Sequence, residues 1–325
     1  MKIFITGGAG FIGSHLVELH LKRGDSVVVM DDLSTGHEGN VTIFRDDERY
    51  RFERGDLLTW DGLEREVQRA DRIYHMAAVV GMFRVLREPV AVTRVNVLGT
   101  ERLLGCVARA KHQPQLVIAS SSSVYGHSHA PDLREGMELV FSVENNALAG
   151  YALSKLTNEV QALAYRQEYG VSVAIPRLFN AVGPRQSATY GFVLPRFIRQ
   201  ALAGEPLTVF GDGVQTRSFC DVRDTVTALD LLAGNPEDWG QPVNVGRTQE
   251  ISILDLAKLV IARAGSNSLI EFVPLEKGYS AHFLPIQQRH PVIERLQNLT
   301  HFEPAWTLEM TVDDLLEREC ATAVT

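Results

Sequence analysis

The sequence predicts an α/β protein built on a doubly wound parallel sheet, with a smaller C-terminal lobe beside it. Three observations predict this fold. A glycine-rich loop follows a short apolar run at the start, apolar runs then alternate with helical patterns up to residue 178, and the composition changes after that point. We therefore expect a first domain over residues 1–178 and a second, mainly ligand-binding lobe over residues 179–325. Some segments of the second lobe are expected to return to the first domain.

The composition is that of an ordinary globular protein. The chain has 325 residues, of which 45% are hydrophobic and 22% are charged, so it can bury a large core. The formal net charge of -8 argues against a nucleic acid or an anionic membrane as a partner, because both need a basic field. There is no apolar run of about 18 residues, the length that would indicate a membrane span. An anionic ligand must then be held by a local group of arginines.

The cysteines and the start of the chain indicate the cellular compartment of the protein. Cys106, Cys220 and Cys320 are too far apart in sequence for a metal-binding or redox motif, so we expect reduced thiols and no metal site. The first five residues lead directly into the glycine loop, which leaves no room for a signal peptide. We therefore expect a cytoplasmic protein.

The glycine loop is the first element with a chemical meaning. Residues 2–6 form an apolar run that predicts a strand, and residues 14–23 have helical apolar spacing. Between them lies Gly8-x-Gly10-x-x-Gly13, in the strand, turn and helix context that a dinucleotide-binding fingerprint requires. The early glycines let the main chain approach a pyrophosphate at the helix N-terminus, and the last lets the helix pack on the strand.

The end of the next strand indicates which dinucleotide binds. The apolar run at 26–30 ends in Asp31 and Asp32, and Asp31 comes 18 residues after Gly13, close to the expected spacing of about 20. A carboxylate at this position accepts hydrogen bonds from the adenosine ribose and repels a 2'-phosphate. The sequence therefore predicts NAD rather than NADP.

The remaining elements follow from the same patterns. Apolar runs at 51–57, 72–78, 116–120 and 171–178 predict strands, and helical stretches such as 90–110 separate them, which indicates a parallel sheet with helices on both faces. Prolines and glycines over 180–213 predict loop-rich structure at the open edge of the sheet. A helix is expected at 251–264 and a short strand at 269–273. We expect His75, at the end of a strand, to be a satisfied core histidine.

Tyr151 and Lys155 form the candidate catalytic pair. They are four residues apart in a helical pattern, so both side chains leave the same face of the helix. An unperturbed phenol has a pKa of about 10, but a neighbouring ammonium, and a cationic nicotinamide ring if one is bound, favour the phenolate. This pairing lets Tyr151 act as a base.

Taken together, these motifs resemble those of the extended short-chain dehydrogenase/reductases that act on nucleotide-diphosphate sugars. The matching segments occur in one order through nearly the whole chain. They are Thr6 to Gly13, Asp31, Gly55-Asp56-Leu57, His75-Met76-Ala77-Ala78, Asn96 to Thr100, Ser120 to Gly126, Tyr151 with Lys155, Arg177 to Arg185, and Gly211-Asp212-Gly213 with Arg217.

The resemblance implies an NAD site in the first domain. Asp56 and Leu57 would line the adenine pocket, and Ala77 and Ala78 the nicotinamide side. The full set of expected cofactor residues is Gly7, Gly10, Phe11, Ile12, Gly13, Asp31, Asp32, Asp56, Leu57, Ala77, Ala78, Asn96, Tyr151 and Lys155.

The resemblance also implies a UDP-sugar substrate and a first chemical step. Tyr151 would take the proton from the sugar 4-hydroxyl, Lys155 would bond the nicotinamide ribose, and Ser121 would bond the reacting oxygen. The product of this step is a 4-keto sugar. Residues expected to bind the substrate are Asn180, Arg185, Arg217 and Arg289, and Arg84 and Arg87 are candidates for capping the sugar pocket.

The later step separates three classes within this family. The segment 201–219, the run Gly183 to Gln186, and Arg289 ahead of Pro291 resemble UDP-glucuronate decarboxylases. Ser123, however, stands where those enzymes usually have a glutamate, and Ser-Ser-Ser-Val-Tyr-Gly is common in 4-epimerases. Dehydratases carry Asp-Glu where this chain has Ser122 and Ser123, so elimination lacks its carboxyl pair.

We therefore expect an NAD-dependent UDP-glucuronate decarboxylase that gives a UDP-4-keto-pentose, UDP-xylose or both, with Ser123 as a further catalytic candidate. The alternative is a UDP-sugar 4-epimerase acting on UDP-glucuronate or a neutral hexose. A non-catalytic NAD-binding scaffold is a minor alternative, because such a protein would be expected to lose Tyr151 or Lys155, and both are present. The helical runs at 92–110 and 151–169 resemble a pair that forms a four-helix dimer interface in this family, so we expect a homodimer.

Overall fold

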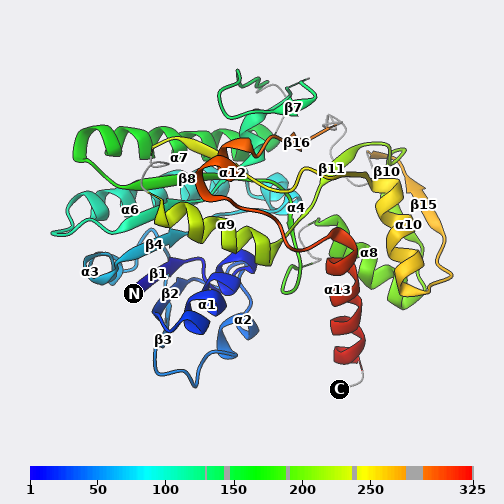
Figure 1. Cartoon of the computed structure of the whole chain (residues 1–325), viewed down its shortest axis with the longest axis horizontal. Coiled ribbons are helices and arrows are strands. Elements are labelled where there is room, and N and C mark those ends of the chain that lie inside the picture. The colour runs from blue at the N-terminus through cyan, green and yellow to red at the C-terminus, as the bar shows by residue number, and fades with distance from the viewer. Residues whose placement is uncertain (129, 143–146, 188–190, 236–239, 276–287, 324–325) are drawn as a thin grey trace.

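A central parallel sheet organises the molecule (Figure 1). The computed structural model describes residues 1–325 except 129, 143–146, 188–190, 236–239, 276–287 and 324–325. The sheet has eight strands in the order β13-β8-β5-β4-β1-β2-β3, and β6 pairs with β8 beyond the end of β5. Its strands are β1 (Lys2–Thr6), β2 (Ser26–Asp31), β3 (Tyr50–Arg54), β4 (Arg72–His75), β5 (Gln115–Ile118), β6 (Ser120–Ser121), β8 (Val173–Leu178) and β13 (Pro242–Val245).

The strand order reverses at β1. The chain runs outward from β1 through β2 to β3, and then returns to build β4, β5 and β8 on the other side. All pairs in this sheet are parallel. The predicted doubly wound parallel sheet is confirmed. In such sheets ligands bind outside the carboxyl ends of the strands, at the point where the order reverses.

Side chains that alternate along the strands supply the two apolar faces of the sheet. In β1, Ile3 and Ile5 belong to one buried cluster, and Phe4 belongs to the other. The first face is covered by α1 (Phe11–Arg23), α9 (Val222–Gly234) and α12 (Glu294–Thr300). The second face is covered by α3 (Leu63–Arg69), α6 (Gly99–Ala108) and α7 (Ala147–Tyr169). The short helix α2 (Gly39–Thr42) follows β2.

The helical stretch expected over 90–110 is interrupted. The chain forms α4 (Met82–Arg87), α5 (Pro89–Thr93), a π-helix at Arg94–Leu98 and then α6. Within the π-helical turn, the Asn96 side chain accepts from the Val79 main-chain N–H at 2.7 Å and donates to the Val79 carbonyl at 3.3 Å. Single π-helical turns are common at functional sites, and this one ties the helices to the loop that follows β4.

The second lobe has its own core. Helices α8 (Val193–Ala203), α10 (Ile253–Ala264) and α13 (Leu308–Ala323) pack together beside the two parallel strands β10 (Leu207–Phe210) and β15 (Ile270–Val273). The prediction of loop-rich structure over 180–213 is wrong for α8. Pro195 lies in the first turn of α8, where no N–H donor is needed, and Leu194, Phe197 and Ile198 are buried.

Short strand pairs connect the lobe to the sheet. Strands β9 (Ala181–Val182) and β12 (Cys220–Asp221) are parallel, β11 (Thr216–Ser218) and β14 (Glu250–Ser252) are antiparallel, and β7 (Asp132–Leu133) and β16 (His290–Pro291) are parallel. These pairs fix residues 216–221 and 290–291 beyond the carboxyl edge of the sheet. The site is assembled at that edge.

Candidate functional site

A cavity of about 630 Å³ lies between the carboxyl edge of the sheet and the second lobe. Nineteen of the twenty residues expected to act in catalysis, cofactor binding or substrate binding line this cavity, and Asn96 is the exception. The nineteen are Gly7, Gly10, Phe11, Ile12, Gly13, Asp31, Asp32, Asp56, Leu57, Ala77, Ala78, Ser121, Ser123, Tyr151, Lys155, Asn180, Arg185, Arg217 and Arg289.

The glycine loop and the start of α1 form one end of the cavity. Gly7 has a φ of +73°, and a Cβ at this position would lie 2.5 Å from the main-chain nitrogen of Ala77. A Cβ on Gly13 would lie 2.3 Å from the Gly7 carbonyl oxygen. The N-cap of α1 is Gly10, with no side chain capping the first turn. The first-turn N–H groups are thus left for an anion such as a pyrophosphate.

Asp31 holds this loop and faces the cavity. Its Oδ2 accepts from the Ala9 N–H at 3.0 Å and its Oδ1 from the Leu33 N–H at 2.8 Å. Burial raises the pKa of the Asp31 carboxyl above its ordinary value, while the two main-chain hydrogen bonds act in the opposite direction. The neighbouring Asp32 is more exposed and accepts from the Ser34 N–H at 2.8 Å.

We predict that Asp31→Asn weakens NAD binding and narrows the preference for NAD over NADP. A hydrogen bond to a charged group contributes about 1.5–3 kcal/mol, so the Kd for NAD should rise about 10- to 100-fold. Calorimetric titration with NAD and with NADP measures both quantities. Asp61→Asn, which makes the same change at an exposed position outside the cavity lining, is the matched control and should bind NAD as the wild type does. Equal NAD affinity in the two variants would contradict this role for Asp31.

His75, the expected core histidine, and Asn96, an expected cofactor residue, lie behind the cavity wall. His75 is 3% exposed and is bonded to the hydroxyls of Thr6 at 2.7 Å and Thr100 at 2.9 Å. Burial, and then the charge of Lys155, lower the pKa of His75 to about 3, so it is the satisfied core histidine that the sequence predicts. Asn96 is fully buried, and its amide also donates to the Ser154 hydroxyl at 3.1 Å. It joins the loop after β4 to α7.

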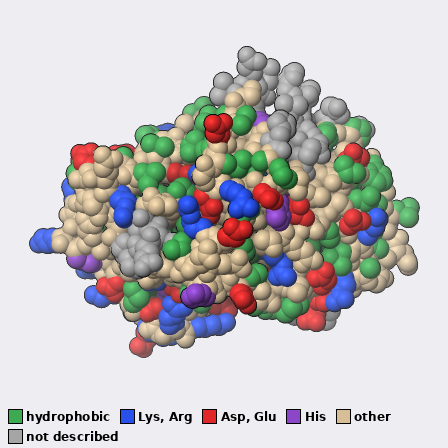
Figure 2. Space-filling model, turned by 45° about the horizontal axis from the view of Figure 1, so that its top comes forward, with side chains coloured by type: hydrophobic (Ala, Val, Ile, Leu, Met, Phe, Trp, Pro, Cys, Tyr) green, Lys and Arg blue, Asp and Glu red, His purple; other side chains and the backbone are tan. Residues whose placement is uncertain are grey.

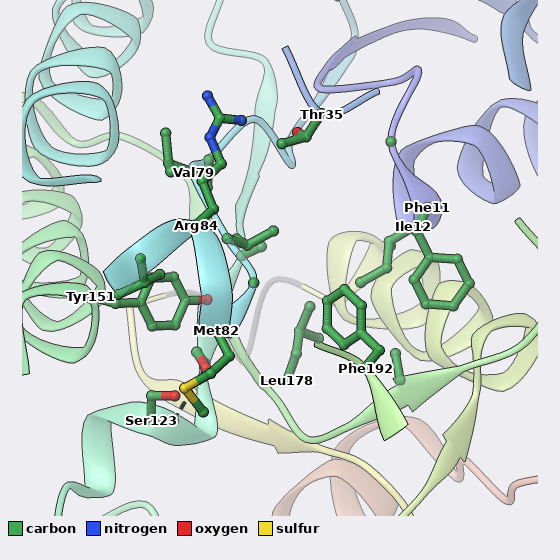
Figure 3. Close-up of a pocket in the computed structure, with 18 of the residues that line it drawn as sticks. Phe11, Ile12, Thr35, Val79, Met82, Arg84, Ser123, Tyr151, Leu178 and Phe192 are labelled. Atoms are coloured by element: carbon green, nitrogen blue, oxygen red, sulfur yellow. Dashed lines mark hydrogen bonds between the residues drawn. The ribbon is translucent and has the colours of Figure 1, made fainter. Parts of the chain in front are cut away.

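Tyr151 lines the cavity. Its hydroxyl points into the space bounded on the far side by Leu178 and Phe192 (Figure 3). Burial raises the pKa of Tyr151 above 10, whereas a hydrogen bond with Ser121 and the positive charge of Arg289 lower it. Ser121 also accepts from the Ser123 N–H at 3.1 Å and so caps the 3₁₀ turn at Ser122–Tyr125.

Lys155 lies one helical turn beyond Tyr151, in the wall of the cavity. Its ammonium donates to the Ala119 carbonyl oxygen at 2.7 Å, and the residue is 5% exposed. Burial lowers the pKa of Lys155 from 10.5 to about 8, and the charge of Glu159 opposes this. The shared helical face is as expected from the sequence. The sequence suggested Lys155 as the cation that lowers the pKa of Tyr151. In the structure the charge that lowers it is that of Arg289, a residue far away in sequence.

Arg217 and Arg289 bring two positive charges to the same cavity. Arg217, in β11, donates to the Thr216 carbonyl at 2.6 Å. Burial, and then the charge of Arg217, lower the pKa of Arg289 to about 9, and Tyr151 acts in the opposite direction. On the face shown in Figure 2, by contrast, basic and acidic side chains are interspersed. Arg217 and Arg289 thus place two positive charges in one cavity of an acidic protein, the arrangement that an anionic ligand requires.

The other expected ligands of the substrate are held in different ways. Asn180 donates to the Ser218 carbonyl at 3.0 Å. Arg185 adopts a φ of +68°, donates to the Ser14 carbonyl at 3.1 Å and pairs with Glu18 of α1, so its guanidinium joins the loop to α1.

Arg84 lines the cavity and donates to the Ser34 hydroxyl at 3.4 Å. Arg87 is exposed and is not among the lining residues.

Sequence reasoning missed two groups of side chains. Phe210, Gln215 and Arg196 line the cavity at the second lobe, where the Arg196 guanidinium lies 4.9 Å from the centre of the Phe210 ring. Glu159, Arg177 and Ser120 form a buried cluster behind Lys155. Only the second group left a signal in the sequence, because Glu159 follows Lys155 by one helical turn.

Comparison with known proteins places the chain in a family. The model of the NAD dependent epimerase/dehydratase family matches residues 3–246. The chain is 33% identical over 324 residues to UDP-N-acetyl-alpha-D-glucosaminuronate decarboxylase of Bacillus cytotoxicus, covering 97% of each chain. It is 35% identical over 310 residues to UDP-glucuronic acid decarboxylase 1 of Xenopus tropicalis, covering 95% of this chain and 69% of that protein.

A solved structure gives the same placement. The UDP-glucuronic acid 4-epimerase of Bacillus cereus, in complex with UDP-glucuronic acid and NAD, superimposes with a TM-score of 0.87 at 28% identity, over 99% of this chain and 100% of that chain. The glycine loop, the uncapped start of α1 and the tyrosine–lysine pair at the carboxyl edge of the sheet agree with this match. The chain belongs to the NAD-dependent epimerase/dehydratase family.

Proposed function

We propose that this protein is an NAD-dependent UDP-glucuronate decarboxylase. The observation that carries the proposal is the pair of arginines, Arg217 and Arg289, which line the same cavity as Tyr151, with the charge of Arg289 acting on Tyr151. A hexuronate carries a carboxylate in addition to the diphosphate of its nucleotide, and two cations at the sugar end suit such a substrate. The decarboxylases among the relatives support the same assignment.

The residues around the glycine loop fit the cofactor. The first turn of α1 would hold the pyrophosphate, Asp31 would accept from the adenosine ribose, and Lys155 would bond the nicotinamide ribose. Bound NAD supplies the acceptor for the hydride that leaves C4 and the donor that can return it. Tyr151 then removes the proton of the 4-hydroxyl, and Ser121 bonds the same oxygen, so that a ketone forms at C4.

Loss of carbon dioxide follows from the position of the carboxylate. Once C4 is a ketone, the C6 carboxylate is β to it, and the electron pair of the C5–C6 bond passes to the C4 oxygen as carbon dioxide leaves. Arg217 and Arg289 orient the carboxylate for this cleavage. A proton from solvent water adds to C5 of the enolate and the C4 ketone re-forms, which gives a UDP-4-keto-pentose. Return of the hydride to C4 would give UDP-xylose.

A specific observation favours a second candidate, a UDP-glucuronate 4-epimerase. Ser123 lines the cavity at the position where the resembling decarboxylases usually carry a glutamate, and the superimposed Bacillus cereus protein is an epimerase. In an epimerase the 4-keto sugar would keep its carboxylate, rotate and take the hydride back on its other face. The same first step serves both reactions, so Tyr151 and Ser121 keep their roles.

Incubation of the purified protein with NAD and UDP-glucuronate tests the proposal. We expect release of carbon dioxide together with a UDP-pentose or UDP-4-keto-pentose, detected by NMR of the nucleotide sugars. UDP-N-acetylglucosaminuronate is a second substrate to include, since a relative is named for it. UDP-glucose, which has no carboxylate, is the control for carbon dioxide release.

Each outcome of this incubation points to one function. A C4-inverted hexuronate without carbon dioxide contradicts the decarboxylase and supports the epimerase. The absence of turnover with any UDP-sugar contradicts both and supports a non-catalytic NAD-binding scaffold.

We also propose that the protein is a homodimer that joins through α6 and α7. Apolar side chains are exposed on the surface of these helices and of the adjoining π-helix, namely Leu98 (52% exposed), Val160 (59%) and Leu163 (37%). Helices α6 and α7 pack side by side (Figure 1). Pairing this surface with its copy would remove these side chains from water. Light scattering of the purified protein distinguishes one chain from two.

We propose the cytoplasm as the location. Cys106, Cys220 and Cys320 are free thiols, as expected in a reducing compartment. Within the described ranges, none of the helices combines the length and the apolar character that crossing a membrane requires.

A further inference from the structure

A buried carboxylate lies behind the catalytic pair. Glu159 is one turn of α7 beyond Lys155 and is 2% exposed. Its Oε1 accepts from the Ser120 hydroxyl at 2.5 Å and from Nε of Arg177 at 2.9 Å, and its Oε2 accepts from Nη2 of Arg177 at 2.8 Å. A buried carboxylate with bonds of this kind is fixed in place. None of these three residues has a role in the chemistry described above.

The same cluster fixes the end of the strands that carry the site. Ser120 of β6 is in register with Arg177 of β8, and both side chains meet on Glu159. Ser120 stands between Ala119, whose carbonyl accepts from Lys155, and Ser121, which bonds Tyr151. A shift of the Glu159 carboxylate would therefore move both contacts of the catalytic pair.

Glu159 offsets part of the buried positive charge in this region. Lys155 and Arg177 are buried cations, 5% and 4% exposed, and Glu159 pairs with Arg177 at 2.8 Å. Burial lowers the pKa of Lys155 to about 8, and the charge of Glu159 is the influence that raises it. Buried ammonium groups lose their protons when no anion compensates them. Glu159 thus favours the charged form of Lys155.

Other ionisable groups face the pair from each neighbouring element. His75 of β4 lies near Lys155 but has a pKa of about 3 and stays neutral. Tyr151 is on α7 itself, and Arg289, ahead of β16, faces Tyr151. Arg177 of β8 also donates to the Glu135 carbonyl at 3.1 Å and lies over the ring of Tyr125. In this arrangement Glu159 is the anion whose charge acts on Lys155.

We infer that Glu159, held by Arg177 and Ser120, is a positioning residue that keeps Lys155 charged and holds the Ala119–Ser121 strand end against the catalytic pair. This inference rests on the proposed oxidation at C4, but not on whether carbon dioxide is then lost. It assigns to Glu159 an electrostatic role beyond that of a structural ion pair.

Direct titration of Lys155 tests the inference. The chain has six lysines, so NMR of isotopically labelled lysine side chains can follow each one, and Lys155→Met assigns the resonance of interest. In Glu159→Gln the midpoint of Lys155 should fall by about one pH unit, the scale on which a nearby opposite charge acts. Glu159→Asp retains the charge and should restore most of the wild-type midpoint.

A second variant covers the case in which Glu159→Gln does not fold. Glu159→Gln combined with Arg177→Met removes both charges of the ion pair and leaves no uncompensated arginine, a replacement that folded proteins often tolerate. The Lys155 midpoint should fall in this double variant as well. An unchanged Lys155 midpoint in the folded variants, accompanied by a lower thermal stability, would mean that the cluster is only structural and would overturn the inference.

A kinetic readout connects the titration to the reaction. The single-turnover rate of NAD reduction by UDP-glucuronate should fall in the wild type as the pH rises through about 8, because Lys155 then loses its charge. In Glu159→Gln this fall should occur about one pH unit lower, and an identical profile would contradict the inference. If the wild type turns over no UDP-sugar, the proposed function fails, while the lysine titration still tests the role of Glu159.

Discussion

Tyr151→Phe is expected to abolish NAD reduction by UDP-glucuronate while leaving the binding of both nucleotides intact. The change removes only the hydroxyl, which is hydrogen-bonded with Ser121 and points into the cavity. Without it no group in this position can accept the proton of the 4-hydroxyl. General base catalysis contributes about 10²- to 10⁴-fold, so the single-turnover rate should fall by at least that lower figure.

Absorbance of the reduced nicotinamide in a single turnover measures this rate, and calorimetry measures the two affinities. The matched control is Tyr169→Phe, which makes the same chemical change on the same helix at a half-exposed position. That variant should react at the wild-type rate. If Tyr151→Phe retained a rate within about tenfold of the wild type, below the usual contribution of a general base, Tyr151 would not be the base.

Arg289→Gln is expected to cause the second largest loss, because it removes a cation that serves two purposes. The guanidinium faces the substrate cavity, and its charge lowers the pKa of Tyr151. Loss of a charge-assisted hydrogen bond to substrate costs about 1.5–3 kcal/mol, so the KM for UDP-glucuronate should rise about 10- to 100-fold. The pKa of Tyr151 should rise at the same time.

The pH dependence separates the two roles of Arg289. A phenolate base is active above its pKa, so a higher pKa moves the acidic limb of the rate profile to higher pH. A change in KM with no movement of that limb would restrict Arg289 to substrate binding. Comparison of UDP-glucuronate with UDP-glucose locates the contact. A loss confined to UDP-glucuronate indicates the sugar carboxylate, and an equal loss with both indicates the diphosphate.

Arg87→Gln is the matched control for Arg289→Gln. It removes the same positive charge from an exposed position outside the cavity lining. Its KM and its pH profile should equal those of the wild type. An Arg289 variant that behaved like the Arg87 variant would exclude Arg289 from the site.

The sequence by itself was informative wherever the signal lay within a few residues. The strand, glycine turn and helix over residues 2–23 predicted a dinucleotide site, and that loop and helix now line the cavity with Asp31. The spacing of Tyr151 and Lys155 put both on one face of α7, and the alternation of apolar runs predicted the parallel sheet. Such signals depend on the period of the local structure, which the sequence displays directly.

Helix α8 is an element that the local proline and glycine signals wrongly predicted to be a loop. Pro195 and the glycines around it suggested a loop, but a proline in the first turn of a helix costs no hydrogen bond. Burial of Leu194, Phe197 and Ile198 against α10 and α13 then stabilises the helix. Packing of an amphipathic helix against a core can outweigh a low intrinsic helix propensity.

The electrostatics of the site were decided only by the tertiary structure. Arg289 faces Tyr151 because β16 pairs with β7 beyond the edge of the sheet, while Arg185, with an equally strong motif, turns toward Glu18 of α1. Glu159 meets Ser120 and Arg177 through the register of β6 on β8. The sequence determined the fold, the dinucleotide loop and the tyrosine–lysine pair. Glu159 is one helical turn from Lys155, but Arg289, which acts on Tyr151, and Arg177, which holds Glu159, lie on distant segments, and only packing brings them to α7.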